Sequence, residues 1–206
     1  MFKHGRVALL AIAISAAPLA AHAQGDFFLG GQVGRARVNI DGLNQNTAST
    51  QLLELGYRWQ AGPYVQVGVE GSLGKVGTLS DTAYYYDGAD YATVETTLAA
   101  LGANARFQFG PNSHFFAVVR AGVVRNKQDV HVASTYYDPY SNHSSYAEGS
   151  GSSTDVGGYA GAGIGYDITS SFNISAVLNE YVFANSDYSD GSYNGGTLTV
   201  GAELRF

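Results

Sequence analysis

The sequence predicts an all-β fold, an eight-stranded antiparallel up-and-down transmembrane β-barrel, and three observations carry that prediction. In eight stretches of the chain, apolar and polar residues alternate with the two-residue period of a strand. Long polar segments and short turns alternate between these stretches. An export signal precedes the first stretch, and the last stretch ends on an aromatic residue.

The amino-terminal region has the layout of a cleaved signal peptide. Lys3 and Arg6 supply its positive charge, and an Ala-His-Ala tripeptide before Gln24 supplies the small residues of a cleavage site. The apolar run between them has about a dozen residues, fewer than the roughly 20 that a transmembrane helix needs. We therefore predict that residues 1–23 are a cleaved signal peptide, detached from the fold, and that residues 24–206 form one barrel domain.

The composition agrees with an exported, strand-rich chain. Removal of Lys3 and Arg6 with the signal peptide leaves 9 basic residues against 17 acidic ones, a net charge of −8. Nucleic acid is therefore not an expected partner. The sequence has no cysteine, which excludes disulfides and thiolate metal sites. Its 27 glycines, 15 tyrosines and only 4 prolines suit strands and turns.

The strand period is clearest in the last stretch, where Leu198, Val200 and Leu204 alternate with Thr199 and Glu203. In a membrane barrel the apolar side of each strand faces lipid and the polar side faces the lumen. Each stretch offers about 9 to 11 alternating residues, the length that a tilted transmembrane strand requires. The eight predicted strands lie within residues 27–34, 51–59, 65–73, 94–109, 115–125, 159–166, 172–183 and 195–206.

The connections between these strands alternate in length. Short turns at residues 60–63, 110–113 and 169–171 alternate with long polar loops, of which the longest covers residues 127–154. Outer-membrane barrels have short periplasmic turns and long extracellular loops. Aromatic residues near the short turns would form a periplasmic girdle, although aromatics also favour strands in general. They are Phe27, Trp59, Tyr64, Phe107, Phe109, Phe115, Tyr166, Phe172 and Phe206.

The final strand with its terminal Phe206 resembles the small outer-membrane β-barrels of Gram-negative bacteria, the family of the outer-membrane protein A transmembrane domain and of outer-membrane protein X. In that family the terminal phenylalanine is read by the barrel-assembly machinery. The resemblance covers the whole mature chain and implies that Phe206 is an assembly signal. It also implies a monomer in the outer membrane, with outer-membrane lipids and the assembly machinery as partners.

Seven charged residues occupy the alternate strand positions whose side chains should face the lumen, and Gln66, Asn104 and Gln108 occupy such positions beside them. An eight-stranded barrel is just wide enough for side chains to fill, and buried charges are tolerated when they are paired. We therefore expect a packed ion-pair network, and the resemblance implies the same. A general acid or base role for the glutamates is the alternative. The seven residues are Glu54, Arg58, Glu70, Arg106, Arg120, Glu203 and Arg205.

The other five basic residues of the mature sequence occupy strand positions whose side chains should face outward. They lie where strands leave the membrane toward the long loops. Arg and Lys suit phosphate oxygens, which the outer leaflet presents, so we expect contacts with lipopolysaccharide. The alternative is that these are solvated loop charges. The five residues are Arg35, Arg37, Lys75, Arg125 and Lys127.

The three later loops are rich in tyrosine, with Asp, Ser, Asn and Gly between the tyrosines. Such mixtures make adaptable contacts, and loops on a rigid scaffold often bind ligands. We weigh an extracellular ligand against loops that are only hydrated cover. The tyrosines are Tyr84, Tyr85, Tyr86, Tyr91, Tyr136, Tyr137, Tyr140, Tyr146, Tyr188 and Tyr193.

Signals for catalysis and metal binding are weak. His143 and Ser144 fall in a predicted loop, unlike the lipid-facing His and Ser of lipid A deacylase barrels, and Asp187 and Asp190 match no calcium loop closely. We therefore predict no enzyme, no cofactor and no metal. The expected role is structural or interactive, through the extracellular loops and lipopolysaccharide. A narrow passive pore for ions or small solutes is the first alternative, and a lipid-modifying enzyme is the second.

Overall fold

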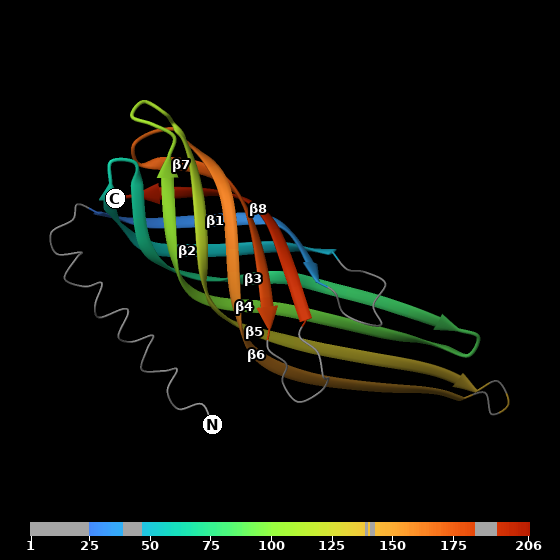
Figure 1. The fold of residues 1–206 in the computed structure, drawn as a ribbon. Helices are drawn as coiled ribbons and strands as arrows, with labels where there is room; N and C mark the ends of the chain where they lie inside the picture. The colour runs from blue at the N-terminus through green and yellow to red at the C-terminus, as the bar shows by residue number, and fades with distance from the viewer. Residues whose placement is uncertain (1–24, 39–46, 139, 141–142, 184–192) are drawn as a thin grey trace, which may run out of the picture.

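The computed structural model describes residues 25–38, 47–138, 140, 143–183 and 193–206. Their strands hydrogen-bond in sequence order, each antiparallel to its neighbours, and the ring closes between the first strand and the last (Figure 1). This confirms the predicted eight-stranded up-and-down barrel. The strands are β1 (Gly25–Val38), β2 (Thr47–Gly62), β3 (Val65–Tyr85), β4 (Gly88–Gln108), β5 (Phe115–Asp138), β6 (His143–Asp167), β7 (Phe172–Phe183) and β8 (Tyr193–Arg205).

The register between the strands sets the width of the barrel. A row of paired residues that starts at Phe27 and passes through each strand in turn returns to β1 at Arg37, ten residues further along. Such a stagger tilts the strands against the barrel axis and leaves an interior that side chains fill. The predicted signal peptide, residues 1–23, lies outside the described residues. Among those described, no helix is long and apolar enough to cross a membrane.

Side chains alternate between the lumen and the outer surface, as predicted. On β1, Phe28 is 3% exposed whereas its neighbour Phe27 is 59% exposed. On β2, Glu54 is buried between the exposed Leu53 and Leu55. The outer surface is therefore apolar where polar residues fill the interior, the reverse of a water-soluble protein.

Strands β3 to β6 extend far beyond their predicted long-loop ends, whereas β1 and β2 are longer by only a few residues at each end. Pairing continues to Tyr85 and Gly88 between β3 and β4, and to Asp138 and His143 between β5 and β6. The long loops predicted between residues 73 and 94 and over residues 127–154 are therefore wrong in their main part, because both regions are mostly strand with a turn at the end. Together they form a four-stranded extension beyond the barrel (Figure 1). We call its described residues within 78–94 and 130–154 the projecting sheet.

A β-bulge on β3 lies where the projecting sheet leaves the barrel. Lys75 pairs with Thr97 and Gly77 pairs with Thr96, so β3 carries one extra residue, Val76. Gly77 has a φ of 144°, a backbone conformation that favours glycine. The bulge also shifts the parity of β3, so the residues after it face the opposite side from the one that the strand before it predicts.

Candidate functional site

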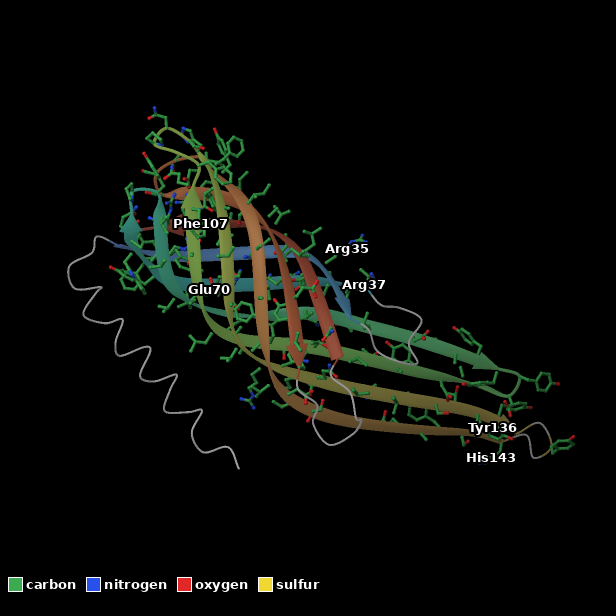
Figure 2. The ribbon with its side chains drawn as sticks, in the orientation of Figure 1. Arg35, Arg37, Glu70, Phe107, Tyr136 and His143 are labelled. Carbon is green, nitrogen blue, oxygen red and sulfur yellow. The ribbon has the colours of Figure 1, made fainter. Side chains whose placement is uncertain are left out.

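The centre of the lumen is an ion-pair cluster with Arg120 and Glu70 at its core; Figure 2 labels Glu70. The Arg120 Nε donates a hydrogen bond to Glu70 Oε1 at 2.7 Å, and Arg120 Nη2 lies 2.5 Å from Glu54 Oε1. Glu70 also accepts hydrogen bonds from the Tyr159 hydroxyl at 2.8 Å and from Asn104 Nδ2 at 2.9 Å. These five side chains come from five consecutive strands, so the cluster links β2 through β6 across the lumen.

A second layer of the network lies closer to the short turns. Arg58 Nη1 contacts Glu203 Oε1 at 2.7 Å, and Arg58 Nε donates to Asn104 Oδ1 at 2.7 Å. Asn173 Nδ2 donates to the same Glu203 oxygen at 2.9 Å. The Arg58 guanidinium lies 4.0 Å from the centre of the Phe28 ring, so an aromatic side chain fills the remaining space.

The third layer depends on a residue that the sequence analysis missed. Asp167 Oδ2 lies 2.5 Å from Arg106 Nη2, and Asp167 Oδ1 lies 2.6 Å from Arg205 Nη2. Asp167 lies two and four residues after Gly165 and Gly163, which were assigned to the lumen side of β6. This alternation could have predicted that Asp167 also faces the lumen. With Asp167, four arginines face four carboxylates in these three layers, so the charges of the ion pairs balance, and a further buried carboxylate, Asp155, lies on β6 toward the long loops. The network includes all seven residues predicted for the lumen.

The lumen changes character toward the long-loop end of the barrel. There an apolar cluster includes Leu52, Val76, Leu98, Val124 and Phe183, with Tyr181 stacked on Phe183 at 6.4 Å between ring centres. A cavity of about 20 Å³ lies beside Val76, Leu98 and Phe183, room for about one water molecule. The described part of the lumen is thus filled by ion pairs toward the short turns, and by apolar side chains together with buried polar ones such as Asn126 and Thr197 toward the long loops.

Five basic residues mark the outer rim between the barrel and the projecting sheet. Lys75 Nζ lies 2.8 Å from Glu95 Oε2, and Lys127 Nζ lies 2.8 Å from Asp129 Oδ1. These two lysines therefore have their charges matched by neighbouring carboxylates. Both pairs are about half exposed, so water weakens them.

The three arginines of the rim differ from the lysines. Arg35 and Arg37 point outward from β1 near its long-loop end, as Figure 2 shows, and Arg125 points outward from β5. All three are exposed, and within the described ranges none of them forms an ion pair.

The tyrosines predicted for loops lie mainly in the strands of the projecting sheet. Six are in β3 to β6 and two in the turns at its end, and the exposed fraction ranges from 42% for Tyr91 to 102% for Tyr86. Tyr146 donates a hydrogen bond to Glu148 at 2.9 Å, which raises the pKa of Tyr146. Hydrogen bonds with Thr93 and Ser80 lower the pKa of Tyr91. Tyr193 begins β8, and Tyr188 lies outside the described residues.

Phe206 closes the barrel. Its backbone N–H and C=O exchange hydrogen bonds of 3.0 Å with the backbone of Phe27, which joins the last strand to the first. The Phe206 ring is 75% exposed on the outer surface at the short-turn end. The terminal residue therefore combines a backbone role in closure with an accessible side chain.

Residues with catalytic or metal-binding potential do not gather in one place. His143 and Ser144 are exposed at the far end of the projecting sheet, the region that Figure 2 marks with Tyr136 and His143. Within the part of the chain that the structure describes, no three His, Cys, Asp or Glu side chains are grouped to hold a metal ion. Asp187 and Asp190 lie outside it.

Comparison with known proteins places the chain. The model of the outer membrane protein beta-barrel domain matches residues 7–206. Ail, the attachment invasion locus protein of Yersinia pestis, crystallised with the heparin analogue sucrose octasulfate, is 18% identical, with 89% of this chain and 99% of that chain covered and a TM-score of 0.53. A major outer membrane protein of Thermus thermophilus is 14% identical, with coverage of 89% and 100% and a TM-score of 0.52.

No curated protein sequence matches the chain significantly. At the identities of these two structures, their likeness shows a shared fold. The family match, in contrast, spans nearly the whole sequence and agrees with the eight-stranded ring. The chain therefore belongs to the outer membrane protein beta-barrel domain family, and its place is the outer membrane of a Gram-negative bacterium.

Proposed function

We propose that the protein is a closed, monomeric, non-catalytic barrel that acts through its outer surfaces rather than through its lumen. The observation that carries this proposal is the filled interior, in which balanced ion pairs lie below an apolar cluster with a cavity of about 20 Å³. A hydrated ion needs a wider, continuous path. The surfaces left for function are the rim and the projecting sheet, which the signal peptide (residues 1–23) and the assembly signal at Phe206 would deliver to the cell surface.

Single-channel conductance in a planar bilayer tests the closed lumen. The refolded mature chain should show no conductance steps, because the Arg120 cluster blocks the lumen. Glu70→Gln and Arg120→Ala variants serve as comparison, since each removes the ion pair between these two residues and Arg120→Ala also removes side-chain volume from the lumen. Reproducible steps from the unmutated protein that change with these substitutions would contradict the proposal and make the protein a narrow pore.

At the rim, the proposed partner is the phosphate of lipopolysaccharide. Arg35, Arg37 and Arg125 carry this contact in the proposal, because the two rim lysines already have carboxylate partners. Replacing the three arginines by glutamine should lower the amount of lipopolysaccharide that copurifies with the protein. Lys75→Gln with Lys127→Gln is the matched control and should change it less. An equal ratio in all three proteins would remove lipid binding from the proposal.

The projecting sheet is the proposed contact surface for molecules outside the cell. Its exposed tyrosines, including Tyr84, Tyr136 and Tyr146, offer broad aromatic contacts at low entropic cost. The sulfated ligand of Ail is a polyanion. The projecting sheet of this chain is acidic, so a ligand of that charge does not suit it. The kind of partner has to come from the sheet itself.

A further inference from the structure

The two faces of the projecting sheet differ in chemistry. The face that continues the lumen side is buried close to the barrel, at Val94, and becomes exposed further out, as at Val132, where it carries alanines and glycines with Asp81 and Asp90 among them. The opposite face carries mainly hydroxyl, charged and aromatic side chains, such as Ser80, Thr93 and Tyr146. The outer part of one face of this sheet thus presents mainly small and apolar side chains although no other described element covers it.

A groove of about 510 Å³ lies on this lumen-side face. Ala83, Ala92, Val132 and Ala147 form its floor, and Val132 is 46% exposed. Asp81 and Asp90 carry carboxylates on the same face at one side of the floor. The groove therefore combines an apolar bed with negative charge along one edge.

The two carboxylates have a defined spacing. Asp81 pairs with Ala92 and Ala83 pairs with Asp90, so the two aspartates are diagonal neighbours on adjacent strands, about 7 to 8 Å apart. Ser134 donates a hydrogen bond of 2.6 Å to Asp90, which orients that carboxylate. Alternate residues of an extended chain are separated by about 6.6 to 6.8 Å. An extended peptide laid in the groove would therefore bring one side chain to Asp81 and the next but one to Asp90.

The negative charge of the projecting sheet favours a positively charged partner. Residues 78–94 and 130–154 contain five acidic residues and no Lys or Arg. A polyanion is therefore repelled, whereas Lys and Arg can lay their aliphatic stems on an apolar floor and place their charges at carboxylates. Tyr85 and Tyr136 share the lumen-side face near its end and offer rings for cation–π contacts. The acidic residues are Asp81, Asp87, Asp90, Asp138 and Glu148.

The geometry points to a docking site for an extended basic polypeptide, with Arg or Lys at alternate positions, on the lumen-side face of the projecting sheet. This inference rests on the proposed surface role and names the partner class for it. The basic side chains bind Asp81 and Asp90, and the intervening residues lie over Ala92 and Val132. The strand edges of the sheet are not required, because the contact is made by the face.

Peptide binding to the full protein in phosphatidylcholine vesicles tests the site. The probe is a fluorescent 12-residue peptide of alternating Arg and Ser, and a Glu-Ser peptide of equal length is the control probe. Asp81→Asn with Asp90→Asn should weaken Arg-Ser binding about tenfold or more, the loss expected for charge-assisted contacts. Glu95→Gln with Asp129→Asn removes two carboxylates outside the groove and should weaken it by less than about threefold.

A steric pair of variants separates the groove from general charge attraction. Ala92→Phe fills the floor and should abolish binding, while Ala89→Phe, on the same strand but the opposite face, should leave it intact. Three results would each overturn the site. They are an equal loss of binding for the two pairs of carboxylate substitutions, normal binding by Ala92→Phe, and tighter binding of the Glu-Ser peptide than of the Arg-Ser peptide. These results are independent of the conductance experiment, so a failed docking site leaves the closed barrel standing.

Discussion

Strands β3 to β6 pass through two solvents, and their two parts differ accordingly. Within the barrel their outer face is apolar, as at Leu73 and Leu101, because it meets lipid. In the projecting sheet the same face becomes polar, as at Ser80 and Thr93, although the ladder of paired residues continues without interruption apart from one bulge. The side-chain pattern of a strand therefore indicates which solvent its outer face meets, lipid or water. Where the strand ends depends instead on backbone pairing with its neighbour.

The ion pairs of the two parts differ in the same way. Glu70 and Arg120 are about 95% buried in the lumen, whereas Lys75 and Glu95 at the base of the sheet are 45% exposed. Removing one partner of a buried pair leaves an uncompensated charge away from water. Removing one partner of an exposed pair leaves a charge that water solvates.

The largest expected effect follows from that contrast. Glu70→Gln should lower the free energy of unfolding by roughly 3 to 5 kcal/mol, because Arg120 loses one of its two carboxylate partners inside the lumen. Glu95→Gln should lower it by less than about 1 kcal/mol. Urea unfolding of both variants in the same lipid vesicles measures the difference, and equal losses would show that the lumen is hydrated enough to screen its charges.

The sequence was sufficient to predict the barrel because lipid imposes a strict alternation on each membrane-crossing strand. It predicted the lumen residues for the same reason, since parity alone places Glu54, Arg58 and Arg120 inside. The ends of β3 to β6 were not predictable in this way. Beyond the rim the outer face of these strands meets water, so apolar residues no longer recur at every second position. Ser, Thr, Tyr and Gly take their place, and these residues are equally typical of loops.

The candidate sites show the same division. Asp167 was missed because it is the last residue of β6, next to a turn, where pattern arguments about strand ends are weakest. The groove was missed because its floor consists of single alanines and valines from four strands, which are brought together only by cross-strand register. Register is a property of pairing between distant segments and is not contained in any one of them.

A smaller effect is expected where the two regions bury apolar side chains. Leu98→Ala in the apolar half of the lumen should lower the free energy of unfolding by about 3 kcal/mol, since a buried leucine leaves a cavity when it is truncated. Val132→Ala in the projecting sheet should lower it by less than about 1 kcal/mol, because its side chain is half exposed already. Thermal or urea unfolding of the two variants checks this, and a larger loss for Val132→Ala would mean that the groove is covered.

The smallest effect concerns the joint between the regions, the bulge at Gly77. A Cβ at this position would clash with the Ala48 Cβ, whereas a Cβ at Gly110, which also has a positive φ, meets no atom within 4 Å. Gly77→Ala should therefore destabilise the protein by about 2 kcal/mol more than Gly110→Ala, the usual penalty of overpacking, when both are unfolded in urea.

The bulge also decides which residues of β3 face the groove. Without the extra residue, a one-residue shift would turn Leu79, Asp81 and Ala83 to the opposite face. We expect Gly77→Ala to increase amide hydrogen exchange in residues 78–94 while the rest of the barrel keeps its protection, and to weaken binding of the Arg-Ser peptide in parallel. Retained protection with normal binding would show that the register of the projecting sheet is set by its pairing with β4 alone, and that the bulge follows from it.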